Sequence, residues 1–531
     1  MIRHAALTST DALFGFQKIV RAAWFFPGAI DAEMLRGALD EFGDAHPIFR
    51  GRVCRRAPPS RNVNLNLLQM CAPPRPPFSD YSVRGRPSEE ARIPLFVHEL
   101  DGVDPGNGYA DVREEDVLRG SGNTTYLPDD IMRGVVPCMQ VSLTHLNHRH
   151  QQQQHHHHDQ SLMGSVVAVG MSHAVVDASG MHMAVAELAR MYRSRVLLEE
   201  ADRLPYLKSP PPKLSASRTP ILDAMRKHSI DPSRKGSTRP SHPRRLDLSG
   251  YRGNALWFFI RRMQRSQIAP AHLPRARLSF SRHELDALQQ RTPRANNAAE
   301  ALCGRLLCEL TRGAEGIAAV RVEMPVDMRR VIHQSTTGCF GNGEYYTGNA
   351  VHVVAAKGLV RLAIGEAILS PSSAAKVTDA FVRELQALTQ SLRDDPESVV
   401  AEWLDRAQSL DEGIVVGSRT AGEEGAITLV VNSHRRLAGA TTLLPGLDLF
   451  GAAAGACARF VPGQSDAVQL LPGVGDNEGG VDVLVSLPMA LRTPAERSSA
   501  PTTGDWVARL ESERFRQRLL CGGSLSDVDD V

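Results

Sequence analysis

Two residues of this chain have the types and spacing of an acid–base site: His173 and Asp177, which form an H-x-x-x-D element. The element follows an apolar run at residues 166–169 and precedes a helical pattern, so the imidazole is expected where a strand ends. A histidine at a strand end that opens into a cleft is well placed to act as a general base. With 19 His and 59 acidic residues in 531, about two such pairs are expected by chance, and a second one occurs at His155 and Asp159. His173 therefore gains its significance from the surrounding sequence and not from the spacing alone.

The composition indicates a globular protein with balanced charge. The 531 residues, 42% hydrophobic and 23% charged, are enough for about two to three domains. A net charge of +2 gives no electrostatic reason to expect nucleic acid or a membrane as a partner, because binding a polyanion needs a concentrated basic face. The sequence contains no long apolar run typical of a membrane span, no apolar signal segment near its start, and no C-x-x-C pair among its eight cysteines. We expect a cytoplasmic monomer that holds no metal and no permanent cofactor.

Strand and helix patterns alternate along the chain, which is typical of an α/β protein. The first part contains, in order, a strand at 22–26, a helix at 31–42, strands at 138–143 and 166–171, and a helix at 181–192. The second part contains strands at 277–281, 318–324, 350–355, 426–431 and 481–487, with helices at 283–290 and 298–310. The second part repeats the first in kind, which predicts two α/β lobes.

A tract of four Gln and four His, residues 151–158, separates two of the expected strands. One interpretation is a loop that collects metal together with His145, His148 and His150. The interpretation we favour is a repeat tolerated at an exposed hairpin tip, because flexible contiguous histidines rarely offer a fixed tetrahedral geometry.

Residues 208–250 are rich in proline and basic residues and cannot bury enough apolar surface to make a domain. We interpret them as a long crossover whose basic residues form a solvated surface or, alternatively, a phosphate-binding lip. The crossover divides the chain into an N-terminal lobe, 1–207, and a C-terminal lobe, 251–531. An active-site channel is expected between the two lobes.

Short segments along nearly the whole chain resemble the BAHD acyltransferase family, the acyl-CoA-dependent O- and N-acyltransferases of plants and fungi. The resemblance implies two chloramphenicol-acetyltransferase-like lobes of mixed sheet and helices. The matching segments are residues 7–11, 25–27, 46–47, 51–52, 173–177, 278–281, 284–288, the V-D-x-R segment at 325–330, a G-N element at either 340–342 or 348–351, and the last strand at 479–488.

This resemblance also implies roles for individual residues. It makes His173 the general base, and it makes Asp177 the partner of a salt bridge to Arg329 that fixes the His-bearing loop. Gly180 is interpreted as a backbone requirement at the helix start. Asn432 and His434 stand where the family has T-S-W, and both can donate a hydrogen bond to an oxyanion; the alternative is that they are ordinary loop residues.

Two departures from the family pattern are evident. The family usually has Gly immediately after the motif Asp, whereas Ala178 and Ser179 intervene here. The D-F-G-W-G signature survives only as a remnant with Asp448, Phe450 and Gly451, and its tryptophan is absent. The signature is structural in the family, so this erosion affects local packing more than chemistry.

The resulting prediction is an acyl-CoA-dependent O-acyltransferase, with N-acyl transfer as an open alternative. It would move an acyl group such as acetyl from acyl-CoA to a hydroxyl or amine of a small specialised metabolite, in a direct ternary complex. One competing hypothesis is a condensation-type enzyme that uses carrier-protein thioesters. Those enzymes usually carry two adjacent histidines, but Ser172 precedes His173. The other is a non-catalytic scaffold of the same fold.

Overall fold

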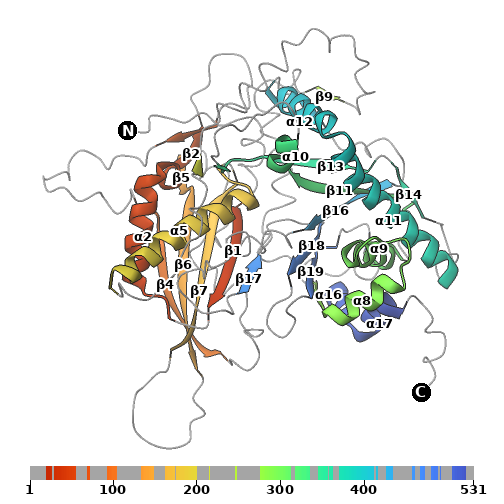
Figure 1. The fold of residues 1–531 in the computed structure, drawn as a ribbon, viewed down its shortest axis with the longest axis horizontal. Coiled ribbons are helices and arrows are strands. Elements are labelled where there is room, and N and C mark those ends of the chain that lie inside the picture. Colours follow the sequence, from red (N-terminus) through yellow and green to blue (C-terminus); the bar gives the residue numbers. More distant parts are fainter. Residues whose placement is uncertain are drawn as a thin grey trace, which may run out of the picture.

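The computed structural model describes residues 19–26, 29–55, 68–71, 92–103, 133–148, 162–173, 175–199, 214–215, 245–247, 276–312, 317–334, 345–356, 358–362, 370–411, 414–416, 426–433, 457–460, 467–472, 480–487, 491 and 505–521. These residues form two α/β lobes that lie side by side (Figure 1). The 151–158 tract lies outside them.

A five-stranded sheet forms the N-terminal lobe. In spatial order its strands are β17 (Cys457–Phe460), β1 (Ile19–Phe26), β7 (Leu162–Ser172), β6 (Met139–His148) and β4 (Leu95–Val103). β1, β6 and β7 pair antiparallel, whereas β4 runs parallel to β6. β6 and β7 are therefore the two arms of the expected hairpin.

Helices α2 (Ala32–Ala45) and α5 (Ala178–Glu199) pack against one face of this sheet (Figure 1). Asp31 caps α2 by accepting a hydrogen bond from the Met34 N–H at 2.7 Å, which satisfies one of the free donors of the first turn. Leu35, Leu39 and Phe42 lie on one face of α2 and are fully buried. The apolar spacing read from the sequence thus accounts for this helix and for the way it packs.

The larger sheet belongs to the C-terminal lobe. Its strands are, in spatial order, β10 (Ala276–Phe280), β19 (Val481–Val485), β18 (Ala467–Pro472), β16 (Ala426–Ser433), β11 (Ala319–Asp327) and β13 (Val351–Ala355), and β14 (Val360–Arg361) also pairs with β11. β11, β16 and β18 are parallel, so their carboxyl ends meet at one edge. β13 and β19 are antiparallel to their neighbours, so their amino ends lie at that same edge.

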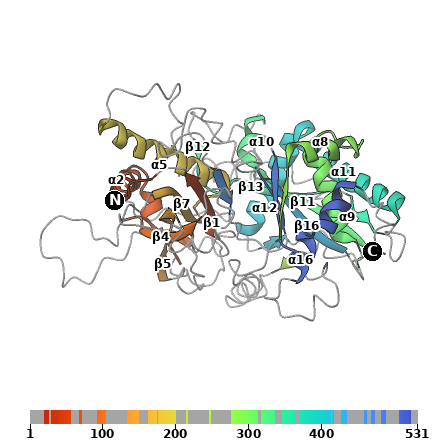
Figure 2. The ribbon, with the colours of Figure 1, turned by 90° about the horizontal axis from the view of Figure 1, so that it is seen from below.

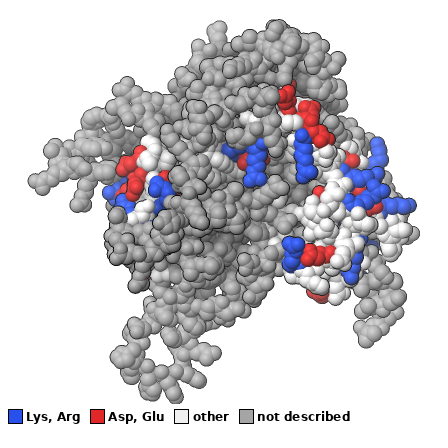
Figure 3. Space-filling view, in the orientation of Figure 1, with Lys and Arg blue, Asp and Glu red and all other residues white. Residues whose placement is uncertain are grey.

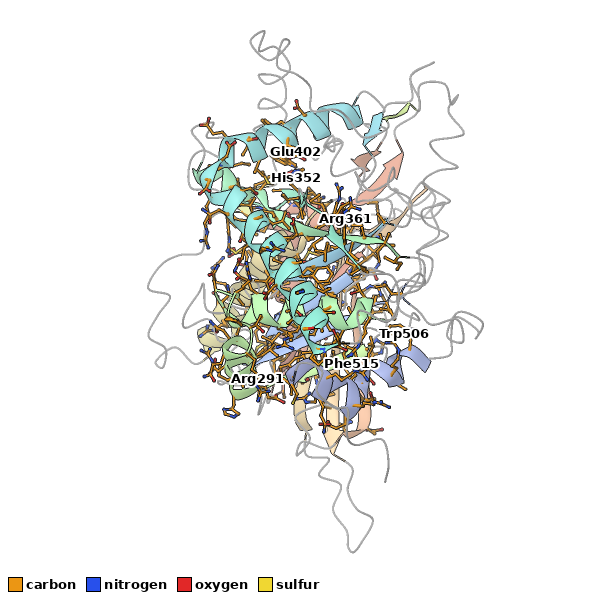
Figure 4. The ribbon with its side chains drawn as sticks, turned by 90° about the vertical axis from the view of Figure 1, so that its right-hand side faces the viewer. Arg291, His352, Arg361, Glu402, Trp506 and Phe515 are labelled. Carbon is orange, nitrogen blue, oxygen red and sulfur yellow. The ribbon has the colours of Figure 1, made fainter. Side chains whose placement is uncertain are left out.

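Helices cover the face of this sheet that lies away from the N-terminal lobe (Figures 1 and 2). Ser281 and Glu284 form a reciprocal capping box at the start of α8, which explains why a helix follows β10 directly. Trp506 and Phe515 lie together at one end of the lobe, and His352 and Glu402 lie at the other (Figure 4). The helices are α8 (Arg282–Gln290), α9 (Ala298–Thr311), α11 (Pro371–Asp394), α12 (Pro396–Asp411), α16 (Asp505–Glu511) and α17 (Glu513–Cys521), with α10 (Met328–Gln334) following β11.

The lobes are not separate along the sequence. β17 comes from the C-terminal half of the chain but pairs antiparallel with β1 in the N-terminal sheet. The described pieces of the crossover also pair with later segments, β8 (Leu214–Ser215) with β12 (Tyr345–Tyr346) and β9 (Arg245–Asp247) with β15 (Ile414–Val416). The sheets therefore do not follow the boundaries 1–207, 208–250 and 251–531 at every strand. The remaining short elements are η1 (Pro47–Arg50), β2 (Arg52–Arg55), β3 (Leu68–Cys71) and β5 (Arg133–Pro137).

The described surface carries both signs of charge. On the face in Figure 3, Lys and Arg side chains lie beside Asp and Glu side chains. Within the described part of the chain, no helix combines the length and the apolar character needed to cross a bilayer.

Candidate active site at the junction of the lobes

His173 lies in the turn that joins β7 to α5, as predicted from the sequence. The turn is tight, because the backbone N–H groups of Val175 and Val176 both donate to the Ser172 carbonyl, at 3.0 and 3.3 Å. Met171, Val175 and Val176 are fully buried in the N-terminal core, whereas His173 is only partly buried. Buried apolar neighbours on both sides thus anchor a turn that holds the imidazole outside the core.

Asp177 ends this turn, and its carboxylate is completely buried. Oδ1 accepts from the Gly180 N–H at 2.8 Å and from Arg329 at 3.0 Å, and Oδ2 accepts from Arg329 at 2.9 Å and from the Ala350 N–H at 2.9 Å. Among the described residues, His173 is not one of its partners. The ion pair with Arg329 that the resemblance implied is present, and these four hydrogen bonds occupy both oxygens of the Asp177 carboxylate.

Arg329 uses all five of its guanidinium N–H donors. Two form the bidentate pair with Asp177, one goes to Asp327 at 2.9 Å, and the others go to the carbonyls of Tyr346 and Gly348. A bidentate Arg–carboxylate pair is stronger and more directional than a single contact. Because Asp177 and Arg329 are 152 positions apart, this pair fastens the His-bearing turn to the C-terminal lobe.

Burial and charge act in opposite directions on the ionisable groups here. Burial alone would lower the pKa of Arg329, but the negative charges nearby, with Asp177 the largest, raise it well above its ordinary value. Burial also raises the pKa of Tyr345 to about 12, against the lowering effect of the Arg329 charge. The guanidinium carbon lies 5.1 Å from the centre of the Tyr345 ring. At neutral pH this is a fixed cation beside a neutral phenol.

Ser179, one of the two inserted residues of the motif, makes a second contact between the lobes. Its hydroxyl donates to Oδ2 of Asp327 at 2.8 Å, while Oδ1 of Asp327 accepts from Arg329. The departure from the family spacing therefore supplies a hydrogen bond to the V-D-x-R segment. The sequence motifs include Ser179 and Asp327 but predict no role for either residue.

Asn349 holds the His173 turn directly, because its side-chain amide donates to the backbone carbonyl of His173. The Gly348 carbonyl accepts from Arg329, and the Ala350 N–H donates to Asp177. Of the two candidate G-N elements, the one at 348–349 thus lies in the site. Residues 341–342 lie outside the described residues.

Gly180 is required by a close approach between backbones. A Cβ atom at this position would lie 2.1 Å from the Thr347 carbonyl oxygen. No side chain larger than hydrogen fits there unless α5 moves away from residues 345–350. The glycine expected at the helix start is therefore explained by packing against the other lobe.

Asn432 lies near the carboxyl end of β16, at the same sheet edge as Asp327 on the parallel neighbour β11. Its backbone pairs with Gln469 of β18. His434 and the signature remnant with Asp448, Phe450 and Gly451 lie outside the described residues. No group of three or more His, Cys, Asp and Glu in the described part of the chain is arranged to hold a metal.

Comparison with known proteins supports the fold. No family model matches the sequence, and no curated protein is significantly similar to it. Among solved structures, TRI101 of F. graminearum, complexed with coenzyme A and T-2 mycotoxin, is similar with a TM-score of 0.50 and 14% identity, covering 92% of this chain and 96% of that one. TRI101 of F. sporotrichioides with coenzyme A and T-2 gives 0.51 and 12% over the same shares.

The first condensation domain of the calcium-dependent antibiotic synthetase, in complex with a substrate analogue, has a TM-score of 0.53 and 14% identity, covering 98% of this chain and 97% of that one. The chain thus has the two-lobed chloramphenicol-acetyltransferase-like fold of these structures, which confirms the predicted fold class. At these identities the similarity establishes the fold alone.

Proposed function

We propose that this chain is a BAHD-type acyltransferase that moves an acyl group from acyl-CoA to a hydroxyl or amine of a small molecule. The observation that carries the proposal is the geometry of His173, which both lobes hold in place at their junction. Its turn is fixed by Asn349 at the His173 carbonyl and by the Asp177–Arg329 pair. A base must be positioned within hydrogen-bond reach of the proton it removes, and this arrangement supplies that rigidity.

In the proposed reaction, His173 removes the proton of the acceptor hydroxyl while the oxygen attacks the thioester carbonyl. The tetrahedral intermediate collapses, the carbon–sulfur bond breaks, and the thiolate of CoA takes the proton back from the imidazolium. No acyl-enzyme is needed when both substrates are bound together. Asn432, at the same sheet edge, is our candidate donor to the oxyanion.

The similarity to TRI101 bound to coenzyme A supports acyl-CoA as the donor, and the similarity to a condensation domain supports a carrier-bound thioester as the second candidate. Ser172 before His173 favours the first, because condensation domains usually have a second histidine there. A monomer in the cytoplasm, as expected from composition, belongs to the same proposal.

The test is release of free thiol from mixed acyl-CoAs in the presence of a metabolite extract. We expect His173→Ala to lower the rate by about 10²- to 10⁴-fold, the usual contribution of a general base, with an unchanged melting temperature. His283→Ala, at an exposed position on α8, is the matched control and should leave the rate unchanged. Equal thiol release by wild type and His173→Ala would refute the catalytic role and favour a scaffold. Acyl transfer from an acyl-carrier-protein thioester, but not from acyl-CoA, would favour the condensation reaction.

A further inference from the structure

The two faces of the C-terminal sheet differ in chemistry. The face toward the helices is apolar, with Val320, Val322, Leu429 and Leu470 in the core of the lobe. Side chains alternate along a strand, so the residues between them point to the opposite face. That second face, which we call the inner face, carries Arg321, Thr428, Asn432, Gln469, Leu471 and Leu484.

The inner face is directed toward the N-terminal lobe. Leu471 and Leu484 belong to the hydrophobic core of that lobe, so the sheet contacts it along β18 and β19. Asn432 belongs to the same face, and so does Asp327 at the carboxyl end of β11, where the Asp177–Arg329 pair is formed. A molecule lying along the inner face would therefore reach the turn that carries His173.

Arg321 is the unusual residue of this face. It is 7% exposed, and no described residue forms a hydrogen bond or an ion pair with its guanidinium. An arginine side chain keeps its charge at physiological pH, and a buried charge is costly unless it is paired. Arg329, two residues beyond the end of β11, is also buried, but all of its guanidinium donors are paired.

Gln469 gives a second observation of the same kind on the inner face. It is 3% exposed, and its Oε1 atom has no hydrogen-bond partner among the described residues. More than nine in ten buried polar groups are paired in native proteins. Arg321 and Gln469 are thus two buried polar side chains on one face that have unpaired atoms among the described residues.

We infer that Arg321 binds an anionic group, a carboxylate or a phosphate, of a substrate that extends along the inner face toward His173. The inference rests on the proposed function for the identity of the substrate. Arg321 lies six residues before Asp327 on β11, which is about 20 Å along a strand. The phosphates of coenzyme A are separated from its thiol by a long pantetheine arm, and an acidic acceptor could present a carboxylate. Both are anions that a guanidinium binds well.

The experiment compares full-length wild type with Arg321→Met and a matched control, Arg383→Met. Arg383 is an exposed arginine on helix α11, which packs against the opposite, apolar face of the sheet. Coenzyme A, pantetheine, inorganic phosphate and benzoate serve as probes, and binding is measured by calorimetry. Thermal melting without any probe is the second readout, because methionine keeps the apolar stem and removes the unpaired charge.

We expect Arg321→Met to melt at the same or a higher temperature than wild type without probe and to bind an anionic probe roughly ten- to hundredfold more weakly. Arg383→Met should bind as wild type does. Weaker binding of coenzyme A and phosphate, with pantetheine unaffected, would assign the site to the donor. Weaker binding of benzoate alone would assign it to the acceptor.

Unchanged affinity of Arg321→Met for every probe would overturn the inference, and so would its failure to fold, because the guanidinium would then have a structural role. The proposed function fails separately, if wild type neither binds coenzyme A nor releases thiol. If phosphate or benzoate still bound in a way that depends on Arg321, the anion site would be supported although the proposed acyl transfer would not.

Discussion

Asp177 accepts four hydrogen bonds from three places in the chain: the start of its own helix, Arg329 of the V-D-x-R segment, and the backbone of Ala350. These bonds use both carboxylate oxygens, and none of them comes from His173. The spacing of the motif suggests a catalytic dyad, but the contacts place Asp177 in the junction between the lobes and leave His173 alone as the proposed base. The role we propose for Asp177 is therefore to position the turn.

Replacing Asp177 with Asn tests this division. The amide would direct its N–H donors at a guanidinium and leave Arg329 as a buried, poorly paired charge, so we expect a loss of about 3–5 kcal/mol in the free energy of unfolding. Activity should fall with the amount of folded protein, as measured by urea denaturation alongside thiol release. Asp286→Asn, which breaks an exposed pair with Arg282 on α8, is the control and should cost less than about 1 kcal/mol. Full stability together with a lost rate would show that Asp177 acts in the chemistry.

Tyr345 gives the site a dependence on alkaline pH. Its pKa is raised from 10.0 to about 12 by burial, so the folded state favours the neutral phenol more than the unfolded state does. The stability that the neutral phenol contributes is complete below pH 10 and is lost as the pH rises from 10 toward 12. Thermal melts across this interval should show a steeper fall for wild type than for Tyr345→Phe, which cannot ionise. Parallel curves would mean that the phenol does not ionise in the unfolded chain before the folded one.

At the scale of elements, the start of α5 is fixed by contact with residues 345–350. Gly180→Ala would place a methyl group 2.1 Å from the Thr347 carbonyl oxygen, a backbone atom that cannot rotate aside. We expect a lower melting temperature and a lower rate, because α5 and the His173 turn must shift together. Gly37→Ala on α2 is the matched control, since its methyl group would meet only the mobile end of the Arg195 side chain.

The control should be neutral or stabilising, because alanine is the better helix former by about 0.5–1 kcal/mol. Differential scanning fluorimetry of both variants, with thiol release on the same samples, gives the comparison. Equal melting temperatures for the two variants would contradict the close approach at Gly180.

Local pattern was enough to predict many of the elements. The helix expected at 31–42 is α2, and the strand at 166–171 is the centre of β7. Helix α11 was missed although Val377, Phe381, Leu385 and Leu388 repeat on one buried face, so its signal was present in the sequence. Such periodicity is a property of neighbouring residues and is readable without the fold.

The site could be predicted only in part, for a physical reason. His173, Asp177 and Arg329 came from motifs, but the partners that complete them are backbone groups such as the Tyr346 carbonyl and the Ala350 N–H. Backbone groups carry no sequence signature. Their identity depends on how residues 345–350 lie against the turn, which is a tertiary property.

At the scale of the molecule, the lobes share structure in both directions. β17 supplies an edge strand to the N-terminal sheet, and Leu471 and Leu484 complete its hydrophobic core. The pairing of β17 with β1 joins residues more than four hundred positions apart, and no local sequence pattern predicts it. The site lies at the carboxyl ends of β11 and β16, which is where open α/β sheets bind ligands.

This sharing predicts that the N-terminal part cannot fold alone. A fragment of residues 1–207 would leave one edge of β1 unpaired, would remove Leu471 and Leu484 from the core, and would bury Asp177 without Arg329. We expect it to lack a cooperative urea transition and near-ultraviolet circular dichroism, because each loss leaves backbone, apolar surface or charge uncompensated. Co-expression with residues 208–531 should restore both signals, and with them thiol release, as the second fragment brings back every missing partner. A cooperative, monomeric transition of 1–207 by itself would show that the N-terminal lobe is complete without β17 and that the contacts between the lobes serve the site but not the fold.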